Sequence, residues 1–322
     1  MSPSKSKHNK PALAGFVLAG ALAVNLLLSG CVATPVRELQ AQWPAELPAQ
    51  VLLADTPFIA QEEFECGPAA LAMLLQSAGM KVSAEQLKPQ VYLPGRQGSL
   101  QLEMLVAARR QGLPAYLVPP RLDAVLAEVA AGHPVLVFQN LSLPIYPVWH
   151  YAVLIGYDRE RNTVTLHSGL TSQLEMSLSA FERTWARGEH WAMLALPADQ
   201  LPATAQAASF GPAIAALERL NAAAARPAYA SALQRWPDDL LLQMGAGNSA
   251  YASGDLAAAE AAFRRATQVH PQAALAWNNL AQVLMERGQT PAAREAITRA
   301  VALGGPMLSR YQDLQRRLNA EP

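Results

Sequence analysis

A 34-residue spacing in the C-terminal third is the feature that most constrains the fold of this 322-residue chain. Gly254 and Gly288 are separated by that spacing. Several coincidences at one period indicate stacked helical hairpins, in which small residues let paired helices approach and large residues fill the gap between them. Alanine-rich hairpins without a shared register are the alternative. The other pairs that keep the spacing are Ala259 with Ala293, Phe263 with Ile297, Ala266 with Ala300, and Pro237 with Pro271.

This order of small, aromatic, small and proline residues resembles the tetratricopeptide repeat. Trp277 and Leu280 fit the first helix of one repeat, as do Ala246 and Gly247 one period earlier. The resemblance implies an all-α repeat domain over residues 211–322, with a concave surface for a protein partner. Residues that suggest a third, degenerate repeat are Ala225, Tyr229, Ala232 and Pro237.

The N-terminus has the layout of a secretory signal. Three lysines in the first ten residues precede an apolar run from residue 11 to residue 28. The run ends in Leu-Ser-Gly-Cys31, which resembles the bacterial lipobox, so residues 1–30 are expected to be a lipoprotein signal and Cys31 the lipidated residue. An uncleaved membrane helix is the alternative. Because Val32 rather than aspartate follows, we expect an anchor in the outer membrane that faces the periplasm, with residues 31–50 as a Pro-, Ala- and Gln-rich tether.

The chain has two cysteines, so a lipidated Cys31 leaves Cys66 without a disulfide partner. Cys66 is followed by Gly-Pro-Ala-Ala and an apolar run, which places it at the start of a helix. Backbone N–H groups and the helix dipole favour a thiolate there. The alternative is an inert, buried cysteine that acts as a small hydrophobic residue.

Nucleophilic thiol chemistry also needs an imidazole and donors for an oxyanion. His150 opens a strand-like run, Tyr151 to Gly156, and is the best candidate base. Gln61 and the backbone N–H of Cys66 are the candidate oxyanion donors. The other histidines fit structural roles better, although His167 is close enough along the chain to border the site.

The segment from residue 51 to residue 197 is expected to form one α+β unit in which helices precede strands. Ser83, Ser99 and Ser179 are expected to cap helices, because serine before an apolar run is typical of an N-cap. A Pro- and Ala-rich linker is expected at residues 198–210. The expected helices are 68–78, 84–87, 100–111 and 122–131, and the expected strands are 115–118, 134–138, 150–157, 163–167 and 191–196.

The cysteine segment, Gln-x4-Cys-Gly-Pro-Ala-Ala-Leu, and the later His-Tyr-Ala-Val-Leu-Ile-Gly-Tyr-Asp resemble the bacteriocin-processing (double-glycine leader) cysteine peptidases. That papain-like family uses a cysteine, a histidine, an aspartate and an oxyanion-hole glutamine. The resemblance implies an α+β papain-like domain over 51–197, acting on peptides and possessing a catalytic set of Cys66, His150 and Gln61. Ser168 stands where the family has its aspartate; Asp158 and Glu175 are the nearby carboxylates.

Loss of the orienting charge leaves three outcomes: reduced activity, substitution by another group, or a domain that only binds. Two functions therefore stay open, a membrane-anchored periplasmic cysteine peptidase and a non-catalytic lipoprotein scaffold. The chain has 25 basic and 25 acidic residues, so its charge gives no reason to expect nucleic acid. No metal-ligand cluster or phosphate-binding loop is visible in the sequence, so no cofactor is expected.

Overall fold

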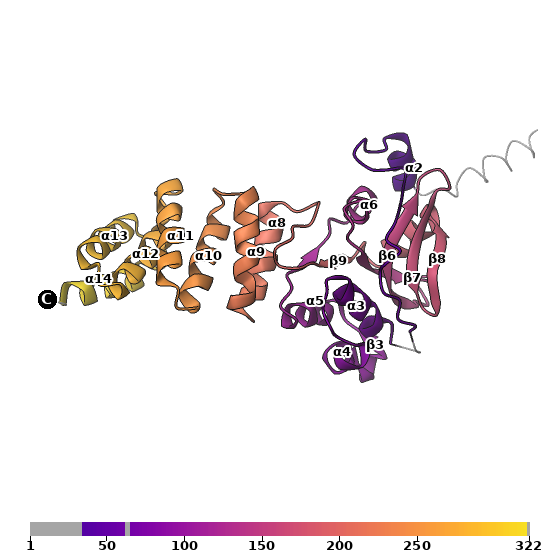
Figure 1. The fold of residues 1–322 in the computed structure, drawn as a ribbon, viewed down its shortest axis with the longest axis horizontal. Helices are drawn as coiled ribbons and strands as arrows, with labels where there is room; N and C mark the ends of the chain where they lie inside the picture. The colour runs from indigo at the N-terminus through magenta and orange to yellow at the C-terminus, as the bar shows by residue number, and fades with distance from the viewer. Residues whose placement is uncertain (1–33, 62–64, 321–322) are drawn as a thin grey trace, which may run out of the picture.

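The computed structural model describes residues 34–61 and 65–320. The predicted signal and Cys31 lie outside this part of the chain. Figure 1 shows a mixed region with a central sheet at one end and a row of helices that extends away from it along the long axis. No helix within the described residues is long and apolar enough to cross a membrane.

The main sheet has seven strands in the order β4-β9-β5-β6-β7-β8, with β1 paired to β6, and every pair is antiparallel. The long central strand, β6, carries His150, and β7 carries Ser168. A separate pair, β2 with β3, lies outside the sheet. The strands are β1 (Gln50–Leu52), β2 (Tyr92–Leu93), β3 (Gly98–Ser99), β4 (Ala115–Leu117), β5 (Val135–Asn140), β6 (Trp149–Asp158), β7 (Thr163–Ser168), β8 (Thr171–Ser177) and β9 (Ala192–Ala195).

Helices cover both faces of this sheet, because the buried strands are apolar on both sides. Alternate β6 residues enter different cores: Val153 and Ile155 pack with the helices on one face, and Ala152 and Leu154 with those on the other. The first face carries α3 (Cys66–Ser77), α4 (Ala84–Val91) and α5 (Gln101–Arg110), with the 3-10 turn η2 (Pro94–Arg96) nearby; the second carries α2 (Thr34–Ala41), α6 (Leu122–Ala130) and α7 (Leu178–Ala186).

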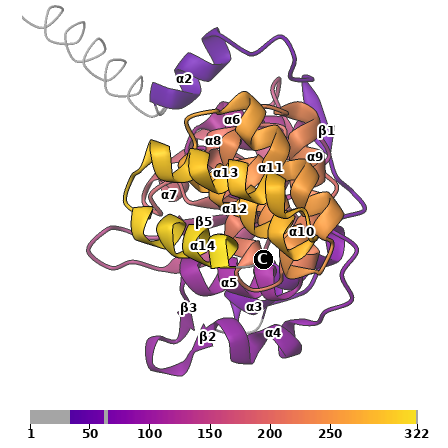
Figure 2. The ribbon, with the colours of Figure 1, turned by 90° about the vertical axis from the view of Figure 1, so that its left-hand side faces the viewer.

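The C-terminal region is a stack of antiparallel helices (Figure 2). Gly247 on α10 explains its packing, since a Cβ atom there would lie 2.4 Å from the Phe263 ring of α11. Small and large residues are therefore matched across the helix pair, as the 34-residue pattern predicts. The helices are α8 (Ala207–Glu218), α9 (Ala222–Arg235), α10 (Leu240–Ala252), α11 (Leu256–Val269), α12 (Ala274–Glu286), α13 (Thr290–Leu303) and α14 (Leu308–Ala320).

Two segments expected to be loose connections are packed instead. The predicted tether, 31–50, contains α2, which buries Val36 and Leu39 in the core. The predicted linker, 198–210, contributes Ala205 and Phe210 to the same core, and α8 begins inside it. The physical reason is that each segment carries apolar side chains, and burying them against the core removes apolar surface from water.

Several local predictions also need correction. Ser83 caps α4 with the expected side-chain bond, but Ser99 lies in β3 and leaves Leu100 as the uncapped N-cap of α5. Ser177 rather than Ser179 caps α7. Strand β8 was not predicted, because its alternating, mostly exposed residues carry little apolar signal.

Candidate active site

The Cys66 thiol lies at the first residue of α3, where the sequence places it. Gly67 follows it because a Cβ atom there would lie 2.2 Å from the Ser99 hydroxyl oxygen. That close approach brings β3 against the start of α3. The backbone N–H groups of Tyr151, Gly67 and Cys66 itself lower the pKa of the Cys66 thiol, so the sulfur faces β6 one residue beyond His150.

His150 is held by Ser168. Its Nε2 lies 2.9 Å from the Ser168 hydroxyl oxygen. Asp158 sits at the opposite end of β6, and Glu175 forms two hydrogen bonds with Arg161 instead. Within the described part of the chain, no carboxylate is hydrogen-bonded to the His150 ring.

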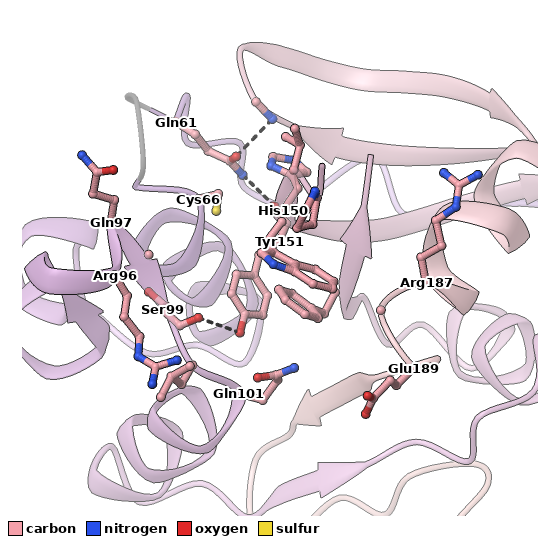
Figure 3. Close-up of a pocket in the computed structure, with 18 residues that line it drawn as sticks. Gln61, Cys66, Arg96, Gln97, Ser99, Gln101, His150, Tyr151, Arg187 and Glu189 are labelled. Atoms are coloured by element: carbon pink, nitrogen blue, oxygen red, sulfur yellow. Dashed lines mark hydrogen bonds between the residues drawn. The ribbon is translucent and has the colours of Figure 1, made fainter. Parts of the chain in front are cut away.

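Gln61 is fixed by both ends of its side-chain amide. Its Oε1 accepts from the Gly169 N–H at 3.2 Å, and its Nε2 donates to the Tyr151 carbonyl at 3.4 Å. A primary amide has two N–H groups, so one donor is still available to a bound oxyanion. Figure 3 shows Gln61 and Cys66 beside the end of β6 that bears His150.

A single cavity of about 900 Å³ joins these groups. Gln61, Cys66 and His150 all line it, and Ser168 lies behind the histidine as its hydrogen-bond partner. The structure therefore brings all four predicted site residues together. His167, by contrast, points away: its ring nitrogens lie 3.1 Å from the Thr56 carbonyl oxygen and 3.2 Å from the Gln173 amide nitrogen.

Burial shifts the pKa values of both Cys66 and His150. It raises the pKa of the Cys66 thiol, and the three backbone N–H donors offset this only in part. Burial also lowers the pKa of His150 to about 4. Both shifts favour a neutral thiol beside a neutral imidazole near pH 7. The donors at the helix start favour a thiolate, but loss of solvent acts in the opposite direction and is the larger effect on the pKa of Cys66.

Sequence reasoning did not find the aromatic wall of the cavity. Trp149 stacks on Phe138 with ring centroids 5.1 Å apart, and the ring centroids of Phe138 and Tyr151 are 4.7 Å apart. The Tyr151 hydroxyl donates to the Ser99 carbonyl at 3.2 Å, which ties β6 to β3 across the cavity. The apolar run Leu-Pro-Ile-Tyr-Pro-Val-Trp before His150 is the sequence signal from which such a wall could have been predicted.

A second cavity, of about 340 Å³, lies among α10, α12 and α14 of the helical array. The Asn279 amide donates to Asn248 at 3.2 Å across it. Asn278 is buried, and its Oδ1 has no hydrogen-bond partner among the described residues. Arg310 and Arg317 also line the cavity. The array therefore offers polar groups suited to a peptide backbone.

The described residues contain no group of three or more His, Cys, Asp or Glu side chains arranged to hold a metal ion.

Comparisons with known proteins identify both regions. Residues 53–193 match the Peptidase C39-like family, and residues 210–259 and 244–306 match tetratricopeptide repeats. One similar solved structure is that of a candidate C39-like peptidase from Bacillus anthracis, with 20% sequence identity, a TM-score of 0.40, and coverage of 46% of this chain and 98% of that one. Curated proteins give no match. The chain thus carries a C39-like peptidase domain at residues 53–193, followed by tetratricopeptide repeats at residues 210–306.

Proposed function

We propose that this protein is a cysteine peptidase in which Cys66 attacks peptide carbonyls with His150 as general base. The observation that carries the proposal is the bond of 2.9 Å between His150 Nε2 and Ser168 Oγ, in a cavity that Cys66 and Gln61 also line. It supplies an oriented imidazole, a nucleophile and an oxyanion donor together.

The chemistry follows from the neutral resting pair. Since Nε2 is taken up by Ser168, Nδ1 is the ring nitrogen left to accept the thiol proton as the sulfur attacks the carbonyl carbon. The remaining N–H of Gln61 and the Cys66 backbone N–H would stabilise the oxyanion. His150 then protonates the leaving amine. Water, deprotonated by the same imidazole, hydrolyses the thioester and restores the thiol.

Hydrolysis of an unfolded protein tests this proposal. The full chain is incubated with reduced, alkylated casein between pH 4 and pH 9, and new N-termini are identified by mass spectrometry. We expect cleavages that are absent with the Cys66→Ala and His150→Ala variants and present with Cys31→Ala. Cleavage that survives Cys66→Ala, or no cleavage at any pH, would contradict the proposal.

Two observations favour a second candidate, a non-catalytic binding domain. The raised pKa of Cys66 and the replacement of the aspartate by Ser168 both weaken nucleophilic activation. On that reading the cavity binds peptides without cleaving them. Iodoacetamide separates the two candidates: His150→Ala slows Cys66 alkylation at pH 7 if the imidazole assists the thiol, and leaves it unchanged if the thiol is inert.

The proposal includes an envelope location and a partner. Cys31 would carry the lipid that anchors the protein to the outer membrane, facing the periplasm, and a Cys31→Ala variant should lose incorporation of labelled palmitate. The array would present a protein partner or substrate to the peptidase domain, since tetratricopeptide repeats generally mediate protein–protein interaction. The unpartnered Asn278 acceptor supports binding in the second cavity.

A further inference from the structure

The loop between β5 and β6 exposes an unusual amount of apolar surface. Ile145 is 75% exposed and Tyr146 76%, and Leu143 and Val148 are also more than half exposed. Single exposed apolar residues are ordinary, but a run of them on one loop indicates a surface that binds something. The loop consists of residues 141–148, and no charged residue occurs in it.

This loop is held in place. The buried Asn140 side chain accepts from the backbone N–H groups of Ser142 and Val148, at 3.0 and 2.9 Å. Arg187 donates to the Ser142 carbonyl at 2.7 Å from the neighbouring turn. Prolines at 144 and 147 restrict the backbone further. Its apolar side chains are therefore presented to solvent by a fixed frame, which lowers the entropy lost on binding.

The loop is continuous with the cavity that contains the thiol. Pro147, Val148 and Trp149 line that cavity. Trp149, itself 51% exposed, stacks on Phe138, which contacts Tyr151. Since Phe138, Trp149 and Tyr151 line the same cavity as Cys66, aromatic side chains connect the exposed loop with the cavity that contains the thiol.

We propose that the 141–148 loop, Trp149 and Phe138 together form an apolar subsite. This subsite selects extended peptides with a large aliphatic or aromatic side chain close to the bond that Cys66 attacks. This inference rests on the proposed peptidase function and adds its substrate class. A lipid surface is the other apolar occupant to consider. Loops that insert into membranes usually carry lysine or arginine beside their apolar residues, and residues 141–149 contain neither.

Peptide binding to the full chain carrying Cys66→Ala tests the subsite independently of catalysis. Two fluorescein-labelled, uncharged dodecapeptides are compared by anisotropy, one with leucine and phenylalanine at alternate positions around a central Gly-Gly and one with serine at those positions. We expect the apolar peptide to bind at least tenfold more tightly. Trp149→Ala should weaken its binding by tenfold or more, as for an aromatic residue at the centre of a contact.

Ile145→Ser provides a second variant that cannot disturb the fold, because the side chain is mostly in solvent. Leu220→Ser, at an exposed leucine outside the cavity, is the matched control and should change nothing. Equal affinities for the two peptides, or affinities that neither loop variant alters, would overturn the inference.

Vesicles of phosphatidylethanolamine and phosphatidylglycerol distinguish the lipid alternative in the Cys31→Ala background. If Ile145→Ser reduces flotation with vesicles while peptide affinity is unchanged, the loop binds lipid and the subsite is refuted. The proteolysis assay with casein reports on catalysis alone. Selective peptide binding without cleavage would therefore retain the subsite and reject the peptidase.

Discussion

The pairing of His150 with a serine sets the chemistry of this site at the scale of single residues. A carboxylate would hold the imidazole in place and also stabilise its charged form, whereas the Ser168 hydroxyl does only the first. With no opposite charge to offset burial, the pKa of His150 falls to about 4. The site thus has an oriented imidazole, and burial favours its neutral form.

Substitution of Ser168 separates orientation from charge. Ser168→Ala removes the bond to Nε2, which is worth about 1 kcal/mol, so we expect Cys66 alkylation at pH 7 to slow by about fivefold to tenfold. Ser168→Asp supplies a carboxylate that raises the pKa of His150 and stabilises a thiolate–imidazolium pair, so alkylation at pH 6 should become faster than in the native protein. Ser231→Ala, in α9, is the control. Slower alkylation in the Asp variant would show that Ser168 does not act through the imidazole.

The loss of activity at low pH should follow the protonation of the His150 imidazole. Because burial lowers its pKa from 6.5 to about 4, the imidazole stays neutral and able to accept a proton down to that pH. We expect casein cleavage to be retained at pH 5.5 and to halve near pH 4, measured as initial rates in a constant-ionic-strength buffer. If cleavage instead falls to half near pH 6.5, His150 is solvated. As an internal check, the pH of half-maximal cleavage should be higher in Ser168→Asp.

The residue-scale site could be predicted to a large extent from the sequence. Cys66 before Gly-Pro, Gln61 five positions earlier and His150 at a strand start are local patterns, whereas Ser168 is implied only by the resemblance to the bacteriocin-processing peptidases. The protonation state could not be predicted, because it depends on what covers the thiol. Residues of β3 and β6, up to 85 positions beyond Cys66, provide that cover.

At the scale of helices and strands, the repeat pattern predicted how the helices of the array pack, whereas the serine patterns did not always predict which residue caps a helix. The contact of Gly247 with Phe263 agrees with the expectation that small residues let paired helices approach and a large residue fills the gap. Caps were less predictable. Ser99 and Ser177–Ser179 each offer a serine before an apolar run, and the choice depends on where the preceding strand ends its pairing.

Gly247→Ala tests the close approach of α10 to α11. The added methyl group would overlap the Phe263 ring, so we expect a loss of about 1–3 kcal/mol in the free energy of unfolding of the array, even though alanine is the better helix former. Chemical denaturation followed by far-ultraviolet circular dichroism measures it. Gly95→Ala, where a Cβ atom meets nothing within 4 Å, is the matched control. Unchanged stability would mean that the two helices separate at little cost.

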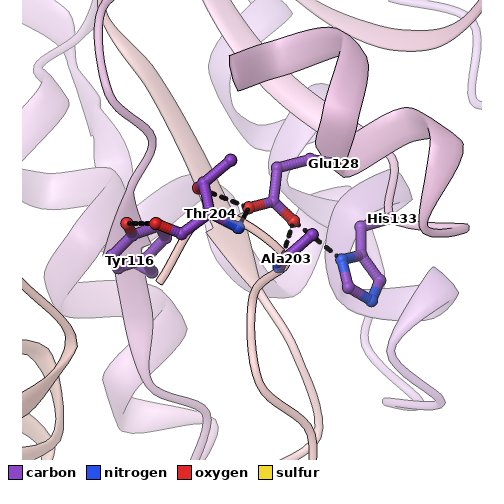
Figure 4. Close-up of polar contacts among 5 residues, drawn as sticks. All are labelled: Tyr116, Glu128, His133, Ala203 and Thr204. Atoms are coloured by element: carbon purple, nitrogen blue, oxygen red, sulfur yellow. Dashed lines mark hydrogen bonds and ion pairs between the residues drawn. The ribbon is translucent and has the colours of Figure 1, made fainter. Parts of the chain in front are cut away.

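Across the whole molecule, the peptidase-like domain and the first helices of the array share one core, and the later helices form another. The Tyr116 ring of β4 meets Phe210 of α8 edge-on at 5.9 Å, and its hydroxyl donates to the Thr204 carbonyl at 3.2 Å. Beside it the fully buried Glu128 accepts hydrogen bonds from the segment that leads into α8 (Figure 4). The composition of that segment resembled a linker, because the groups that fix it are backbone N–H groups, which composition does not reveal.

Glu128→Ala should therefore weaken the joint between the two domains more than any change at an exposed carboxylate. Glu128 Oε1 accepts from the Thr204 N–H and hydroxyl at 2.8 and 2.6 Å, and Oε2 accepts from the Ala203 N–H at 3.0 Å and lies 2.8 Å from His133 Nδ1. Removing the carboxylate leaves these donors buried without acceptors, so we expect a loss of about 3 kcal/mol in the free energy of unfolding. Thermolysin should also cleave within 198–206 in the variant and not in the native protein.

Glu175→Gln, at a half-exposed carboxylate paired with Arg161, should change stability by less than about 1 kcal/mol. If the segment stays protected in Glu128→Ala, the apolar contact of Tyr116 with Phe210 holds the two domains together without the carboxylate.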